Sequence, residues 1–248
     1  TIAFFSTTSL VYTNKLVTIL TESMMKLTND TQNILRNFCE INQSLLVKKG
    51  NVLRTISNMK NILAEATITE EFPNDFAIYD LGEFLGVIGL FKNPDFDFSN
   101  DGYCLIKETG SRTRTKYFYA DPSVITSPPD KKVEMPSVDV DFDITDGQLI
   151  ALQRAAIVYR VEDLSVVGNG EVIELVVRDR KNDTSNVFSV HVGDTDATFC
   201  FNLKVENLKL MAGDYDVNIS SKLISNFKHK EQPVQYWIAL EKTSTYGS

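Results

Sequence analysis

Hydrophobic side chains recur at helical spacing near residue 30 and at alternating positions over most of the remaining chain. After Thr28, which can cap a helix, apolar residues follow at the i, i+4, i+7 and i+11 spacing from Ile34 to Leu45. This pattern predicts an amphipathic helix. Alternating apolar runs, typical of strands, and a second short helix follow it. The predicted strands are 45–49, 52–57, 62–69, 76–79, 95–99, 103–108 and 113–120, and the second helix is 80–92.

Turn sequences and prolines separate these elements. Asn100-Asp101-Gly102 and Gly168-Asn169-Gly170 predict hairpin turns, because glycine adopts positive φ without steric cost. Four of the seven prolines lie between Ala120 and Ser137, and proline neither continues a helix nor donates to a strand ladder. Residues 121–137 are therefore predicted to form an extended connector.

Beyond the connector the order of elements repeats. The strand 138–145 leads into a helix that starts at Asp146, and a further strand, Ala197–Phe201, leads into a helix over 202–211. FAIYDL at 76–81 and FCFNLK at 199–204 each predict a short strand running into a helix, although one such match can arise by chance. We predict an α+β fold with two similar domains, 25–120 and 138–248, each with two helices packed on antiparallel sheets. The other predicted strands are 164–167, 171–177, 187–192, 214–220, 222–227 and 234–240.

Net charge, cysteine content and the lack of catalytic motifs exclude several classes of function. The 248 residues carry a net charge of −8, so the average surface repels nucleic acid and anionic membranes. Three separated cysteines and two histidines make neither a disulfide framework nor a zinc site, and no nucleotide-binding loop or nucleophile motif is present. We therefore expect no enzyme, no metal and no cofactor. Residues 1–24 are too polar for a membrane span, and we expect them to be a non-native or disordered extension that precedes a start at Met24 or Met25.

Positive charge concentrates in the predicted helical segments. Residues 26–49, 80–92, 146–160 and 202–211 carry net charges of +2, −1, +1 and +1, which leaves −11 for the rest of the chain. The helical segments are therefore mildly basic within an acidic chain. The simplest interpretation is that these charges are only the solvated faces of amphipathic helices.

Several segments resemble the sliding clamp of T-even-type bacteriophages. They are NDTQNILRNFCEINQSLLVKKG (29–50), FAIYDLGEFLGVIGL (76–90), ADPSVITSP (120–128), GDYDV (213–217) and YWIALE (236–241), which occur in the same order over residues 25–246. The resemblance implies a DNA clamp fold and a homotrimeric ring. Helices would line a central hole around duplex DNA, and the ring would tether the replicative DNA polymerase as a processivity factor in the cytoplasm of the infected bacterial host.

The resemblance also implies functional surfaces. Side chains expected to face DNA are Arg36, Arg154, Arg160, Lys204 and Lys209. An apolar hollow for partner peptides is expected from Val124, Ile125, Tyr236, Trp237 and Ile238, some of which alternate as core residues would. The subunit interface is expected within Tyr103–Tyr119, with Arg112, Arg114 and Lys116.

Implied partners are a clamp loader, the polymerase and phage late-transcription factors, with no membrane contact. The main alternative is a non-enzymatic phage structural or assembly protein built from duplicated β-rich domains. An enzyme on the same scaffold would need a pocket with clustered titratable groups, and the sequence shows none.

Overall fold

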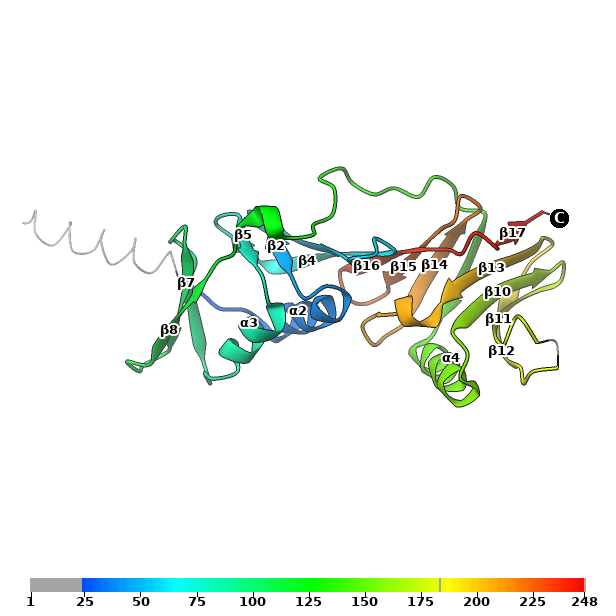
Figure 1. The fold of residues 1–248 in the computed structure, drawn as a ribbon, viewed down its shortest axis with the longest axis horizontal. Helices are drawn as coiled ribbons and strands as arrows, with labels where there is room; N and C mark the ends of the chain where they lie inside the picture. Colours follow the sequence, from blue (N-terminus) through cyan, green and yellow to red (C-terminus); the bar gives the residue numbers. More distant parts are fainter. Residues whose placement is uncertain (1–23, 183, 248) are drawn as a thin grey trace, which may run out of the picture. The chain divides into compact units, whose positions relative to one another are not determined.

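The structure is a computed structural model, and it describes residues 24–182 and 184–247. These residues form two compact units (Figure 1). The first unit contains residues up to 39, 43–52 and 68–125, and the second contains 40–42, 53–67 and the chain from 126 on. The predicted extension lies outside the described residues except for Met24, which pairs with Asp97. No helix in the described part of the chain is long and apolar enough to cross a bilayer.

Antiparallel strands dominate the first half of the chain. A four-stranded sheet runs in the order β1-β6-β7-β8, and β2 pairs with β5. The elements are β1 (Met24–Met25), α2 (Asn29–Ile41), β2 (Leu45–Val47), β3 (Gly50–Ile56), β4 (Ile62–Phe72), β5 (Phe76–Ile78), α3 (Leu81–Ile88), β6 (Pro94–Asp97), β7 (Tyr103–Glu108), β8 (Arg114–Phe118) and the 3-10 turn η1 (Pro122–Val124). The helix predicted after Thr28 is confirmed, because its apolar stripe from Ile34 to Ile41 is buried.

Among the described residues, the second half contains one α-helix, one complete sheet and four strands of another. A five-stranded sheet runs β12-β11-β10-β13-β17, and α4 packs against β10, β11 and β12 (Figure 1). A six-stranded sheet runs β3-β4-β16-β15-β14-β9. The elements are β9 (Val140–Ile144), α4 (Asp146–Tyr159), β10 (Asp163–Asn169), β11 (Val172–Val177), β12 (Phe188–Asp194), β13 (Thr198–Lys204), the 3-10 turn η2 (Val205–Asn207), β14 (Tyr215–Ser220), β15 (Ile224–His229), β16 (Val234–Ala239) and β17 (Thr245–Tyr246).

Pairing between distant strands explains where one unit ends. Residues 53–67 belong to the second unit, although they fall within the first predicted domain, 25–120. The cause is that β4 pairs antiparallel with β16, with Ile62 opposite Ile238 and Ala66 opposite Val234. The compact units therefore do not follow a simple division of the sequence at the connector.

The helix predicted over 202–211 is wrong. Residues 198–204 continue as strand β13, which pairs with β10 as far as Lys204 opposite Asp163. Only the 3-10 turn η2 follows, so the described residues beyond the connector form one α-helix where two were expected. The backbone of residues 202–204 is paired with β10, and this tertiary pairing overrides the local helical spacing.

The turn at Asn100-Asp101-Gly102 is also built differently from the expectation. The Asn100 side-chain oxygen accepts a hydrogen bond from the Gly102 N–H at 2.9 Å, and Gly102 does not adopt positive φ. The turn therefore depends on the asparagine side chain. By contrast, Gly170 has a φ of 90°, as expected for the turn between β10 and β11.

The GDYDV segment contains a glycine that the fold requires. Gly213 has a φ of 140°, and a Cβ at this position would lie 2.2 Å from Nε2 of His229. The imidazole cannot move away easily, because Nε2 lies 3.0 Å from the Ala212 carbonyl oxygen and Nδ1 accepts hydrogen bonds from the Glu231 and Gln232 N–H groups. Any side chain at residue 213 therefore displaces a buried ring.

Gly213→Ala is expected to destabilise the second unit by about 3 kcal/mol, from backbone strain and overpacking together. Urea unfolding followed by the fluorescence of Trp237 measures this, since it is the only tryptophan. Gly147 in α4 has open space around its Cβ direction, so Gly147→Ala is the control and should be neutral or slightly stabilising. Equal unfolding midpoints for the two variants would contradict the packing argument.

A buried carboxylate stabilises the first turn of α2. Glu70 accepts hydrogen bonds from the Thr28 N–H and, at 2.5 Å, from the Thr31 hydroxyl. Burial by itself raises the pKa of Glu70, but the bonds from Thr31, Thr28 and Thr69 outweigh it and hold the pKa below its usual value.

Glu70→Gln is therefore expected to lower stability by about 1–2 kcal/mol at pH 7. Because the folded-state pKa is depressed, the wild-type contribution is present above the unfolded-state pKa and is lost as pH falls through the folded-state pKa. Hydrogen exchange of the α2 amides at pH 7 and at a pH below the depressed folded-state pKa of Glu70 measures both effects. A difference between the two proteins that does not shrink in acid would contradict this role for the ionised carboxylate.

Candidate nucleic-acid interface and docking surfaces

Arg36 lies on the exposed face of α2. Its guanidinium donates to the side-chain oxygens of Asn33 at 2.8 Å and Gln32 at 3.4 Å, both on the same helix. Among the residues that the structure describes, Arg36 makes no ion pair. The helix therefore presents a positioned positive charge that no neighbouring carboxylate neutralises.

Arg154 lies on the exposed face of α4, and Arg160 is the residue at which the helix ends. Thr145 caps the start of the helix, in a capping box with Gln148. Arg160 closes it in the left-handed conformation, with a φ of 57°. Both arginines are exposed and, within the described ranges, neither is in an ion pair. Ile157 and Val158 are 76% and 73% exposed, so this face is largely uncharged.

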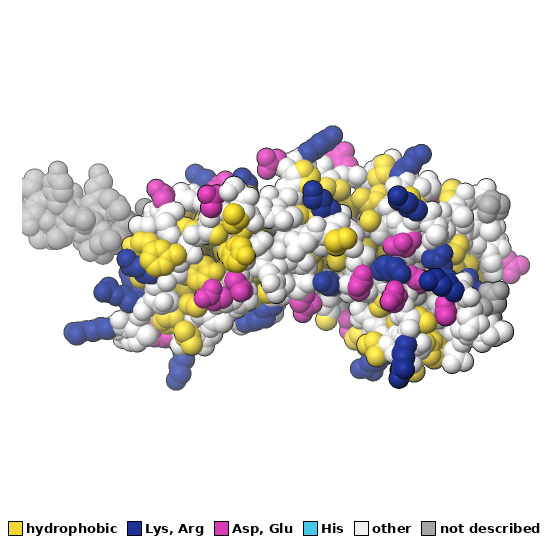
Figure 2. Space-filling model, viewed as in Figure 1, with side chains coloured by type: hydrophobic (Ala, Val, Ile, Leu, Met, Phe, Trp, Pro, Cys, Tyr) yellow, Lys and Arg dark blue, Asp and Glu magenta, His cyan; other side chains and the backbone are white. Residues whose placement is uncertain are grey.

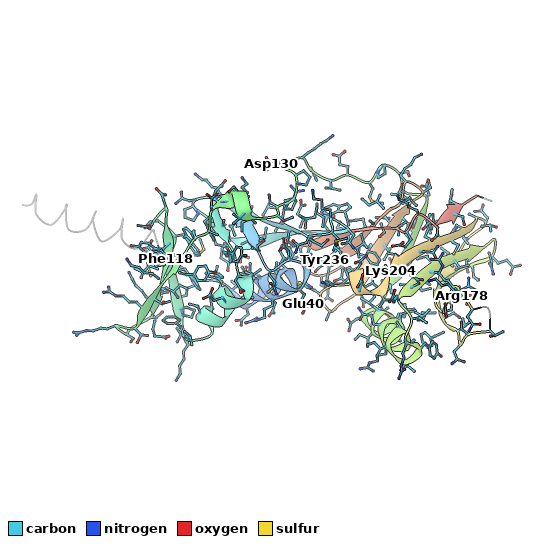
Figure 3. All side chains as sticks on the ribbon, viewed as in Figure 1. Glu40, Phe118, Asp130, Arg178, Lys204 and Tyr236 are labelled. Carbon is cyan, nitrogen blue, oxygen red and sulfur yellow. The ribbon has the colours of Figure 1, made fainter. Side chains whose placement is uncertain are left out.

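The two lysines predicted to face DNA are placed differently. Lys204 lies at the end of β13 and pairs with Asp163 at 2.8 Å and with Glu162 at 3.4 Å (Figure 3). The hydrogen bond to Asp163 is the main reason that the pKa of Lys204 is raised. The Lys209 ammonium donates to the Glu40 carbonyl oxygen at 2.7 Å. Lys204 is thus paired with two carboxylates and Lys209 is bound to a backbone carbonyl, whereas the three arginines have no carboxylate partner within the described residues.

Strand β8 forms a free sheet edge. The Tyr119 N–H donates to the Gly102 carbonyl, and the Glu108 N–H donates to the Thr113 carbonyl. Since hydrogen-bonded pairs alternate along an antiparallel ladder, the N–H groups of Arg114, Lys116 and Phe118 point away from β7. The sheet order leaves no strand on that side among the described residues.

The side chains of this edge are exposed and mostly basic. Arg112, Arg114 and Lys116 are exposed, and the Lys116 ammonium lies 4.1 Å from the centre of the Tyr103 ring. Phe118 is 68% exposed (Figure 3). Lys and Arg side chains project from this end of the first unit in Figure 2. The edge therefore combines free backbone donors, positive charge and an exposed aromatic ring.

The residues predicted for the partner hollow separate by face and by unit. Val124 is 59% exposed and Ile125 is buried, both in the first unit. Tyr236 and Ile238 are fully buried, and the Tyr236 hydroxyl accepts from the Met211 N–H (Figure 3). These two are core residues and cannot line an open hollow, because neither side chain has exposed surface.

Trp237 faces the other side of β16. It packs with Ile56 and Leu63, and Ile224 and the connector residues Val133 and Met135 cover these three. We call the cluster of Ile56, Leu63, Ile224 and Trp237 the connector patch. Of the three predicted residues on β16, only Trp237 belongs to this surface.

Comparison with known proteins decides the family. The family model described as "DNA polymerase processivity factor" matches residues 26–126, and the model "gp45 sliding clamp, C terminal" matches 141–242. The sliding clamp of Vibrio phage KVP40 is 31% identical over 88% of this chain and 99% of its own length. That of Enterobacteria phage T4 is 28% identical over 90% of this chain and 99% of its own. The chain belongs to the sliding-clamp family.

Solved structures agree on the clamp fold. The alignment with proliferating cellular nuclear antigen from Entamoeba histolytica covers 88% of this chain and 98% of the antigen, with a TM-score of 0.63 at 10% identity. The A. fulgidus antigen, solved with the C-terminal region of FEN-1, has a TM-score of 0.64 at 12% identity. The prediction of a two-domain clamp fold is confirmed, and the clamp is a DNA sliding clamp and non-catalytic processivity factor.

The titratable side chains most often used in chemistry have structural surroundings in the described part of the chain. Within the described residues, no group of His, Cys, Asp and Glu side chains could hold a metal ion. The Cys104 thiol is buried, and burial raises its pKa to about 12, so it is not a nucleophile at neutral pH. His229 is held by backbone groups.

The sequence did not single out three residues that lie where the connector meets the sheet: Val133, Met135 and Arg54, whose guanidinium donates to the Pro129 carbonyl oxygen at 2.8 Å. The signal that could have found two of them is the alternation of Val133 and Met135 with the exposed Lys132 and Glu134. Arg54 has no local signal, since its role arises only when β3 lies beside the connector.

Proposed function

We propose that the clamp acts as a homotrimeric ring around duplex DNA in the cytoplasm of the infected bacterial host. The observation that carries the ring is the free edge of β8, whose N–H groups at Arg114, Lys116 and Phe118 lack strand partners within the described part of the chain. An unpaired edge invites a strand from another copy. The proposed acceptor is β12, the outermost strand of the five-stranded sheet. Head-to-tail contacts of this kind close into a ring when the rotation allows.

The proposed DNA-facing charges are Arg36, Arg154 and Arg160, with Lys204 and Lys209 in secondary places. The exposure of the three arginines supports this order, as does the absence of carboxylate partners for them in the described residues. A sliding protein needs few and non-specific phosphate contacts, because many tight ion pairs would hold it at one register. The uncharged remainder of the exposed α4 face suits this requirement.

The proposed partners beyond DNA are the replicative polymerase, a clamp loader and phage late-transcription factors. A closed ring needs an external machine to open it, and the clamp has no nucleotide-binding motif of its own. Partners would dock short peptides at an apolar surface beside the connector. Trp237 supports placing that surface at the connector patch.

Molar mass measured by light scattering over a dilution series tests the ring. A mass near three times 27.9 kDa, falling toward one subunit on dilution, is expected for a reversible trimer. A monomer at every concentration would overturn the proposal of a ring that forms unaided.

A further inference from the structure

The connector patch is an apolar surface on one face of the six-stranded sheet. Leu63 and Trp237 are directly opposite each other on β4 and β16, and Ile56 and Ile224 extend the patch along β3 and β15. Ile56, Leu63 and Trp237 are each less than 10% exposed, although they lie on the face that carries the polar residues Glu65 and Gln235. Something must therefore cover them, and the cover belongs to this chain.

Residues 129–135 provide the cover, and we call them the strap. The strap has no regular secondary structure, and Asp130 marks it in Figure 3. Val133 and Met135 are half-buried against the patch, while Lys132, just before them, and Glu134, between them, are exposed. This alternation is that of an extended peptide lying on a surface with every second side chain inward.

One side chain fastens the strap. Arg54 donates from Nη1 to the Pro129 carbonyl oxygen at 2.8 Å and from Nη2 to the Lys131 carbonyl oxygen at 3.4 Å. Its Nε lies 3.2 Å from a carboxylate oxygen of Glu65, and the other oxygen of Glu65 accepts from Gln235 at 3.2 Å. Both side chains of the ion pair are only 18% exposed, and the two hydrogen bonds from Arg54 point its guanidinium toward the strap.

We propose that the strap is an internal ligand of the connector patch, which a partner peptide must displace. The strap itself indicates the chemistry of that peptide. It is an extended segment with two apolar side chains two residues apart, preceded by backbone carbonyls that reach Arg54. This inference rests on the proposed docking of partner peptides, and it adds that the docking surface is closed when no partner is bound.

Covalent attachment explains why a weak internal ligand can compete. A tethered segment acts at an effective concentration in the millimolar range, so even a poor fit keeps the patch occupied most of the time. If the patch is open for one tenth to one hundredth of the time, the affinity of a partner is reduced by about 10- to 100-fold. Weakening the strap should therefore strengthen partner binding.

The test removes the inward side chains and keeps the chain intact. In the full-length clamp, Val133→Ser with Met135→Ser is compared with Lys132→Ser and Glu134→Ser, which changes the outward side chains of the same segment. Acrylamide quenching of Trp237, the only tryptophan, reports whether the patch is covered. Binding of the replicative polymerase of the same phage, by titration, reports competition.

The first pair of substitutions should increase quenching of Trp237 several-fold and tighten polymerase binding by about tenfold, and the control pair should change neither. A synthetic peptide with the sequence of residues 128–137 should restore protection of Trp237 in the Val133/Met135 variant. The same peptide with serine at both apolar positions should not. Arg54→Gln with Glu65→Gln is a second variant that leaves the patch unchanged. It should speed trypsin cleavage after Lys131 and also tighten binding.

Unchanged quenching in the Val133/Met135 variant would contradict the proposal that the strap covers the patch. Weaker polymerase binding would contradict the proposed competition, since the connector side chains would then form part of the docking surface. A clamp that is retained on circular DNA but binds polymerase equally well in all variants would overturn the internal ligand and leave the proposed ring intact. A chain that is never retained on DNA would overturn the ring, and the quenching and peptide experiments would still decide whether the strap is a ligand of the patch.

Discussion

Lys116→Pro is expected to leave the first unit folded and to dissociate the ring. The N–H of Lys116 points away from β7, so proline removes no hydrogen bond of the β7–β8 ladder. Proline is tolerated on an edge strand whose N–H faces solvent. In a trimer joined through this edge, however, it deletes one bond of the intersubunit ladder and places a ring where the neighbouring strand approaches.

The expected loss is about 3 kcal/mol for each interface, or roughly a hundredfold in its dissociation constant. Sedimentation or light scattering over a dilution series measures it. Lys116→Ala is the matched control, because it removes the charge and the contact with Tyr103 but keeps the N–H. An exposed ion pair contributes only ~0–1 kcal/mol, so the control should change the midpoint by a few-fold at most. Equal effects of the two substitutions would mean that the edge does not join subunits through its backbone.

Replacing Arg36, Arg154 and Arg160 together by glutamine is expected to slow association with DNA by tenfold or more at low salt. Charges that face an opening raise encounter rates by this order, and each phosphate contact contributes about 0.9 to the slope of log affinity against log salt. The slope should flatten accordingly. The lifetime of the clamp on a closed DNA circle should change little, because retention depends on topology.

Lys204→Gln is the control for charge. Lys204 has the same formal charge but is paired with Asp163 and Glu162, so its loss should leave the salt slope unchanged. Association rates and equilibrium affinities over a salt series measure both variants. A slope that flattens as much for Lys204→Gln as for the arginine variant would contradict the assignment of the DNA-facing side chains.

Local patterns predicted most elements correctly where a single face is buried. The stripe from Ile34 to Ile41 predicted α2, and the alternation in 138–145 predicted β9. The failure at 202–211 has a definite cause. Leu203 and Leu208 are both buried, but Leu203 lies in strand β13, paired with β10, and Leu208 follows a 3-10 turn. The spacing of apolar residues in the sequence does not distinguish this arrangement from a helix.

The surfaces were less predictable than the fold, because they depend on which strands meet. The prediction for β16 grouped Tyr236, Trp237 and Ile238, but period-two alternation sends Trp237 to the connector patch and its neighbours to the core. Likewise, Lys204 and Arg154 carry the same formal charge, and the sequence does not show which of them is paired with a carboxylate. Only the fold shows that carboxylates neutralise one of them.

Retention on circular DNA tests the central claim most directly. The clamp loader of the same phage places the clamp on a nicked DNA circle, free protein is removed, and the bound fraction is followed before and after a restriction enzyme cuts the circle once. An encircling ring is expected to remain on the intact circle in salt that abolishes ion pairing and to slide off within minutes of cutting. Equal loss from intact and cut DNA would contradict the account, since the clamp would then hold DNA by affinity.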